Sequence, residues 1–229
     1  MELLKLSRNN RKLKEVARAL ELKRSAVAGF DLPAGWTCPS AQDCKSKADR
    51  VTGKITDGAE CKFRCYATSA ESAFTTTRVM RWYNFDLLRK AKTEYRMQEL
   101  ILASLPANLR IVRIHSSGDF YNRAYFNAWN RVAYLRSDIT FYGYTKQAQY
   151  LENASMPDNM RIVVSAGGRN NDRAPKVARA HVVFSKNQEY PVYTDVKSEL
   201  HVLTQAGDFG LLIHGTQPAG FYKRLAQGV

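Results

Sequence analysis

The sequence has 229 residues, of which 45% are hydrophobic and 11% aromatic, enough for one domain with a buried core and no stabilising cross-links. It contains no run of about 18 apolar residues, and its charged N-terminal segment lacks the apolar region and cleavage site of a secretory signal, so we expect neither a membrane-spanning helix nor export. We therefore expect a cytoplasmic protein in which thiols stay reduced.

The formal net charge of +14 comes from 35 Lys and Arg against 21 Asp and Glu. A charge of this size favours a polyanionic partner, most commonly DNA or RNA, and the alternative is a generic basic protein. Basic residues are dense in residues 1–29 and stand beside aromatic residues further on, a combination that suits phosphate contacts and base stacking. The residues that we expect to contact nucleic acid are Arg8, Arg11, Lys12, Arg78, Arg81 and Arg169.

Residues 1–30 form a basic segment in which residues 9–28 carry Leu13, Val16 and Leu20 at helical spacing. This pattern predicts a basic amphipathic helix, which the glycine and proline of residues 29–35 end. Residues 31–68 contain all four cysteines and little periodicity, so we expect a cysteine-rich loop that a bound metal orders.

Residues 70–105 have a helical pattern, after which short apolar runs alternate with helical segments. The predicted strands cover residues 109–114, 139–144, 161–165, 181–184 and 210–214, with helices over residues 125–135 and 148–153 and a loop after residue 215. Strands that alternate with helices imply βαβ units and a parallel sheet. The chain is too short for a complete eight-fold barrel. The predicted fold class is therefore α/β, a partial βα barrel or open, mainly parallel sheet, in a single domain over residues 1–229 whose βα units occupy residues 69–229.

The four cysteines are Cys38, Cys44, Cys61 and Cys65, separated by five, sixteen and three residues. Four clustered cysteines in a reducing compartment indicate metal binding rather than disulfides. Structural zinc sites usually have tighter cysteine pairs, so this spacing favours an iron–sulfur cluster of the 4Fe–4S type. Zinc is the first alternative, and cysteines that are merely buried or redox-active are the second.

The segment 61–67 resembles the first two cysteines and the aromatic residue of the radical S-adenosylmethionine motif. The third cysteine of that motif would fall at Ala67 and is absent, so Cys38 or Cys44 would have to replace it. Three thiolates would leave one iron open to a substrate or to S-adenosylmethionine, whereas four would close the cluster.

A second group of polar residues follows the predicted strand 109–114. His115, Ser117 and Asp119 lie in the loop after this strand, and Lys146 follows the next strand. Because loops after parallel strands open on the same edge of a sheet, we expect these four residues to form a catalytic pocket, with Arg169 nearby to meet phosphate. The alternative is that Ser117 or Asp119 only caps the following helix.

The order of several motifs resembles the phage and prophage family known as gene product 88. The matching segments are 9–13, 30–39, Cys44, 52–58, 64–67, 114–120 and 141–146, within residues 8–170. The resemblance implies a phage or mobile-element origin, and hence a host-cell cytoplasm, together with a cysteine-ligated site. A looser similarity to radical S-adenosylmethionine proteins shares the arrangement of loops after strands.

The sequence thus leads to a hypothesis with two alternatives. The leading hypothesis is a phage-type iron–sulfur protein that binds nucleic acid and modifies or processes it. The alternatives are a non-enzymatic DNA- or RNA-binding accessory protein in which zinc pins the loop, and a radical enzyme acting on a small molecule. The sequence predicts neither the substrate nor the oligomeric state.

Overall fold

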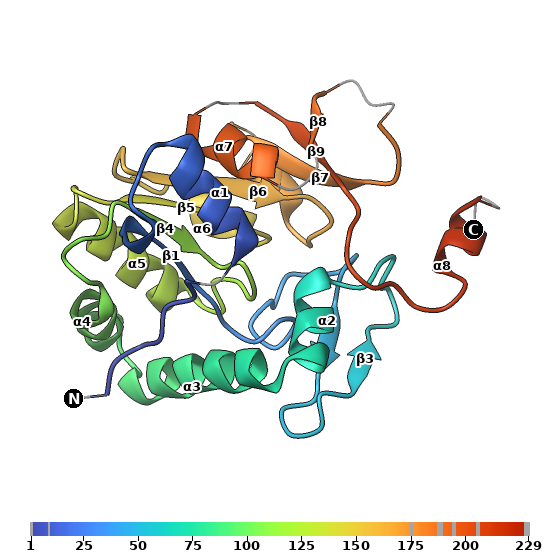
Figure 1. Cartoon of the computed structure of the whole chain (residues 1–229), viewed down its shortest axis with the longest axis horizontal. Helices are drawn as coiled ribbons and strands as arrows, with labels where there is room; N and C mark the ends of the chain where they lie inside the picture. The colour runs from blue at the N-terminus through green and yellow to red at the C-terminus, as the bar shows by residue number, and fades with distance from the viewer. Residues whose placement is uncertain are drawn as a thin grey trace.

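The computed structural model describes residues 2–8, 10–174, 176–186, 190–193, 196–204 and 207–226. One sheet of seven strands runs in the order β1-β4-β5-β6-β7-β9-β8, and its neighbouring strands are parallel. The strands are β1 Val27–Phe30, β4 Ile111–Ile114, β5 Thr140–Thr145, β6 Met160–Ser165, β7 Arg179–Val183, β8 Val192–Tyr193 and β9 Phe209–Leu212. The sheet is open and curls into a half-barrel (Figure 1). The predicted α/β class with an open, parallel sheet is confirmed.

Alternate residues of the central strands face two separate hydrophobic cores, as the period of two in a strand requires. Val112 and Phe141 belong to the larger core, beneath α3 Thr75–Ala91, α4 Glu94–Ser104, α5 Arg123–Leu135 and α6 Ala148–Leu151. Ile111 and Tyr142 belong to the smaller core, with α1 Arg11–Ala19 and α7 Val196–Thr204. Figure 1 shows α1 and α7 side by side on one face of the sheet. These two helices therefore occupy the inner side of the half-barrel.

The N-terminal helix is shorter than predicted. Asn10 caps α1 by accepting a hydrogen bond from the backbone N–H of Lys12, and the helix ends at Ala19; Asn9 lies outside the described residues. Val27–Phe30, predicted to end this helix, instead forms β1 and pairs with β4. All four residues of β1 are buried. Such a short apolar run suits a strand covered on both faces, and periodicity alone cannot distinguish it from a helix end.

The cysteine-rich segment is irregular except for a small antiparallel hairpin, β2 Ser46–Ala48 with β3 Ile55–Asp57. Backbone contacts attach it to the loops of the sheet: the N–H of Leu32 donates to Ser117, and the N–H of Gln42 donates to Gly167. The segment is thus held by protein contacts on the same edge of the sheet as the loops after β4 and β6.

The region predicted as one helix over residues 70–105 is divided in three. The helices α2 Tyr66–Ala73, α3 and α4 are separated at Phe74 and at Lys92–Thr93. Residues 221–226, predicted as loop, form the short helix α8 Phe221–Ala226. Among the described residues, every helix is too short or too polar to cross a membrane.

A candidate site in a cysteine-lined chamber

A cavity of about 160 Å³ lies where the C-terminal ends of the strands meet the cysteine-rich segment. We call this cavity the chamber. Its lining residues that matter below are Lys12, Cys38, Cys44, Cys65, Tyr66, Arg113, His115, Ser117, Asp119, Tyr144, Lys146, Ser165 and Glu199. In α/β folds, the loops at this edge of the sheet are where ligands bind. The predicted pocket and the predicted cysteine site therefore open into the same space.

Three of the four cysteines line the chamber, and all four are free thiols. Cys61 is not among the lining residues: its sulfur lies 3.0 Å from the carbonyl oxygen of Phe63 and 3.9 Å from the hydroxyl of Ser46. The structure thus brings Cys38, Cys44 and Cys65 to one cavity, with Cys61 beside them and outside it. In the part of the chain that the structure describes, no group of three or more His, Cys, Asp or Glu side chains forms a compact site for a single metal ion.

Cys65 is built to be a thiolate. It is the residue before the first turn of α2, where backbone N–H groups are unpaired. A hydrogen bond from the Cys44 thiol lowers the pKa of Cys65 to about 6, and the N–H groups of Ala67 and Thr68 reinforce this shift against the effect of burial. The same thiol–thiol bond raises the pKa of Cys44 well above its ordinary value. At neutral pH the pair is therefore one thiolate and one thiol.

Cys38 has the opposite environment. Burial raises the pKa of its thiol, and the nearby Asp119 and Cys65 add to the effect. Three neighbouring sulfurs cannot all ionise in such a space unless a cation offsets their charge. A metal or a cluster core would supply that cation.

His115 has a strained backbone and a neutral side chain. Its φ of +66° is in the left-handed region, which is unusual for a residue other than glycine and typical of functional sites. Its Nε2 lies 2.9 Å from the hydroxyl of Tyr125, and its buried Nδ1 has no partner among the described residues. Burial, together with Arg113, lowers the pKa of His115 to about 3. The imidazole is thus a neutral hydrogen-bonding group at physiological pH.

The other predicted catalytic residues join the loops that surround the chamber. The carboxylate of Asp119 accepts hydrogen bonds from the Thr145 hydroxyl and the Lys146 N–H, at 2.6 and 2.8 Å. The ammonium group of Lys146 donates to the Ser165 hydroxyl at 3.0 Å and to the Ala166 carbonyl. The hydroxyl of Ser117 donates to the Leu32 carbonyl at 2.8 Å. Each residue lines the chamber, and each has contacts that hold the loops in place.

The alternative that Ser117 or Asp119 caps the next helix is wrong. The side chain of Asn122 accepts the N–H of Tyr125 at 2.8 Å and caps α5. Asp119 is instead turned toward the loop after β5.

Sequence reasoning missed a charged group at another part of the chamber. Arg113 of β4 and Glu199 of α7 form an ion pair at 2.8 Å, and Lys12 lies 3.6 Å from the same carboxylate oxygen. Arg113 and Glu199 are 4% and 1% exposed, respectively, so this is a buried group of charges. The available signal was a single arginine inside the apolar run 109–114.

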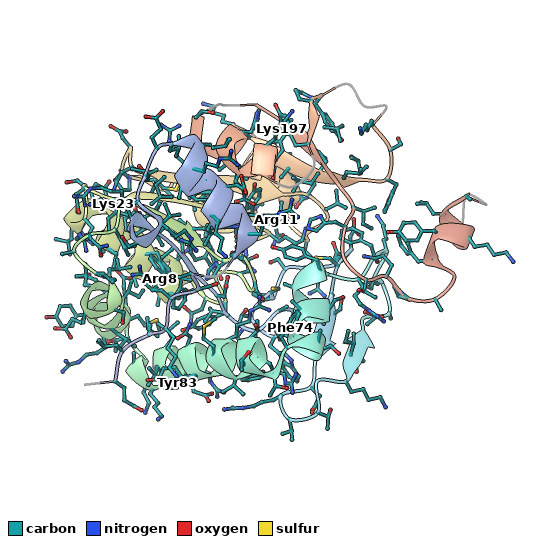
Figure 2. All side chains as sticks on the ribbon, viewed as in Figure 1. Arg8, Arg11, Lys23, Phe74, Tyr83 and Lys197 are labelled. Carbon is teal, nitrogen blue, oxygen red and sulfur yellow. The ribbon has the colours of Figure 1, made fainter. Side chains whose placement is uncertain are left out.

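The residues predicted to contact nucleic acid separate into two groups. Arg78 and Arg81 are buried: Arg78 donates to backbone carbonyls of Glu71, Arg50 and Val51, and Arg81 pairs with Glu71 at 2.9 Å. Both are therefore unavailable to a phosphate at the surface, and their prediction is corrected. Lys12 lines the chamber, and the Arg8 guanidinium donates to the Ser25 carbonyl. Only Arg11 and Arg169 of the six are exposed; Figure 2 shows Arg11 at the first turn of α1.

Comparison with known proteins gives one family. The family model described as "Gene product 88" matches residues 4–227. The Gene 88 protein of Mycobacterium phage L5 is 28% identical over 150 residues, which are 57% of this chain and 62% of the relative. The Gene 88 protein of Mycobacterium phage D29 is 29% identical over 125 residues, or 44% of this chain and 51% of the relative. The chain thus spans less than two thirds of the length of these curated relatives. No solved structure matches, and these matches give no support to the similarity with radical S-adenosylmethionine proteins.

Proposed function

The chain belongs to the gene product 88 family, which has members in mycobacteriophages, and we propose that it is an iron–sulfur protein that acts on a molecule bound in its chamber. Cys38, Cys44 and Cys65 hold the cluster, with Cys61 as a nearby fourth thiol. The observation that carries the proposal is that three cysteines, far apart in the loop, line the same cavity as His115 and Lys146. A cluster bound there faces the polar loops at the edge of the sheet.

The chemistry of the thiols supports a cluster. Cys65 already carries the negative charge that a ligand to iron needs, and N–H groups that point at sulfur are a feature by which proteins tune iron–sulfur clusters. Zinc binds four sulfurs at about 2.3 Å, so its ligands form a tight group. The absence of a compact group among the described residues favours the larger cluster over a single ion.

Ligand number decides what the cluster does. With three thiolates from the chamber, one iron is open to the cavity and takes part in chemistry, and S-adenosylmethionine is a candidate ligand for that iron. With Cys61 as the fourth ligand, the cluster is closed and serves structure or electron transfer. The position of Cys61 outside the chamber favours the open form.

Anaerobic purification and reconstitution with iron and sulfide test the proposal. We expect brown protein with an absorbance band near about 400 nm and about four irons per chain. Cys38→Ser, Cys44→Ser and Cys65→Ser are expected to lose iron and sulfide, whereas Cys61→Ser, the matched control from the same segment, retains the cluster. A colourless protein with one zinc per chain favours the accessory-protein alternative. A metal-free protein with a reversible Cys44–Cys65 disulfide favours thiol redox chemistry.

Nucleic acid is the partner that we propose for the basic surface. The net charge of +14 and the exposed Arg11 and Arg169 support this. Binding of a fluorescent single-stranded oligonucleotide, measured over a range of salt, is expected to lose a slope of about 0.7 for each phosphate contact removed. We expect Arg11→Gln with Arg169→Gln to reduce the slope, and Lys90→Gln, an exposed cation on α3, to leave it unchanged. Affinity that does not depend on salt would argue against this partner.

A further inference from the structure

One part of the chamber holds two cations and one carboxylate. The Nη1 of Arg113 and the Nζ of Lys12 approach the same oxygen of Glu199, at 2.8 and 3.6 Å. These residues come from three different elements: β4, α1 and α7. Within this group the positive charges exceed the negative by one, and the group lies almost entirely out of contact with solvent. A buried excess of charge is unfavourable unless an opposite charge joins it.

The donor capacity of Arg113 is not used up. A guanidinium has five N–H groups, and the buried Nε of Arg113 has no hydrogen-bond partner among the described residues. The guanidinium lies over the ring of Tyr144, 5.4 Å from its centroid, and the ammonium group of Lys12 lies 5.7 Å from that of Tyr66. All four residues line the chamber. The rings orient the two cations without supplying an acceptor in the plane of the guanidinium.

These charges are separate from the cysteines. The cation that acts on Cys38 and Cys44 is Lys146, and the strongest influence on Arg113 after burial is Glu199. The chamber thus has a sulfur-lined part with Lys146 and a second part with Arg113 and Lys12.

We propose that Arg113 and Lys12 form a subsite that binds an oxyanion, a carboxylate or phosphate group, of the molecule held in the chamber. The planar fork of arginine matches the two oxygens of such a group, and lysine adds a second positive charge. Glu199 keeps both cations in position when the subsite is empty. The substrate class is therefore a small anionic molecule, or the anionic end of a larger one. Its role in a reaction rests on the proposed function, but the anion contact itself needs no cluster.

Isothermal titration with inorganic phosphate and with succinate tests the subsite and distinguishes its two sources of oxyanion. We expect saturable binding of at least one probe. Arg113→Gln and Lys12→Gln are each expected to weaken it about tenfold or more. Lys14→Gln on the same helix and Arg110→Gln at the start of the same strand segment are exposed matched controls and are expected to bind like the unaltered protein.

The outcomes separate the subsite from the cluster when each protein is tested both reconstituted and after chelation, with its iron content measured. Anion binding that persists in protein unable to take up iron refutes the cluster and supports the subsite. Full iron content with no binding of either probe, or with equal binding by Lys12→Gln, overturns the subsite. If Arg113→Gln does not fold, Lys12→Gln decides, because Lys12 lies on the surface of α1 and its side chain is 14% exposed.

Discussion

The carboxylate of Asp119 accepts a hydrogen bond from the hydroxyl of Thr145 at 2.6 Å, and this bond joins the loop after β4 to the loop after β5. A second oxygen of the same carboxylate accepts the N–H of Lys146 at 2.8 Å. Asp119 is 4% exposed, so these donors have no water to replace it. The residue predicted as a catalytic acid is therefore also the main connection between two walls of the chamber.

We expect Asp119→Ala to lower the free energy of unfolding by about 2–4 kcal/mol, because it leaves buried donors of two loops without an acceptor. Asp119→Asn keeps one acceptor oxygen and is expected to cost less. Urea unfolding of the metal-free proteins measures both changes. Equal stability of Asp119→Ala and the unaltered chain would show that the bonds to Thr145 and Lys146 do not hold the loops together.

The same residue predicts a pH dependence of stability. Burial raises the pKa of Asp119 to about 6, although the bonds from Thr145 and Lys146 oppose this shift. In the unfolded chain the pKa is about 3.9. Because the folded state holds the proton more tightly, this contribution to stability is complete below pH about 4 and is lost as the pH rises through about 6. The melting temperature of the unaltered protein relative to Asp119→Asn should therefore fall between pH 4 and 7. A difference that is constant over this range would contradict the raised pKa.

Glu71 connects the cysteine segment to the rest of the molecule. Its Oε1 accepts hydrogen bonds from the N–H of Ala34 at 2.8 Å, from Arg81 at 2.9 Å and from the Ser117 hydroxyl at 3.2 Å. Since both members of the Glu71–Arg81 pair are buried, removing one leaves an uncompensated charge, and we expect Glu71→Ala or Arg81→Ala to cost about 3–5 kcal/mol.

Chemical denaturation of both variants and of the double variant Glu71→Met, Arg81→Met measures this coupling. The double variant is expected to lose less than the sum of the single changes, because no charge is left unpaired. Additive losses would mean that the two side chains act independently. Well-folded Arg81→Met protein with weakened oligonucleotide binding would reverse the correction made above for Arg81.

The parts of the fold that could be predicted are those with a local signal. Strands β4, β5 and β6 are apolar runs followed by polar loops, so both the strands and the loops that end at the chamber follow from the sequence. Strand β1 has no such signal, because its four residues continue a helical pattern and pair with β4 only after most of the helical region has passed. Non-local parallel pairing is set by the whole sheet rather than by a segment.

The site shows the same division. His115 and Asp119 could be predicted because a loop after a parallel strand is a common place for a ligand. Arg113 and Glu199 could not, because they meet only when α7 packs inside the half-barrel. Arg81 was misplaced for a related reason: its sequence neighbours do not reveal that it faces the buried Glu71 rather than solvent.

The fit between the loop after β4 and the cysteine segment depends on Gly118. Its φ is +86°, and a Cβ there would lie 2.6 Å from the Thr37 hydroxyl and 2.7 Å from the Cβ of Leu32. Gly118→Ala is therefore expected to cost about 2–4 kcal/mol, since it combines a left-handed backbone with overpacking. It should also separate the cysteine segment from the chamber wall and expose Cys38, which follows Thr37.

The reaction of the thiols with a chromogenic disulfide, combined with thermal unfolding, measures both effects. Gly29→Ala is the matched control: its φ is not positive, and the nearest atom to its new Cβ is the flexible Cδ1 of Leu13 at 3.2 Å. We expect faster thiol reaction and a lower melting temperature for Gly118→Ala than for Gly29→Ala. If the two variants react and melt alike, the cysteine segment does not depend on close contact with the loop after β4, because the clash at Gly118 would then have been relieved without moving it.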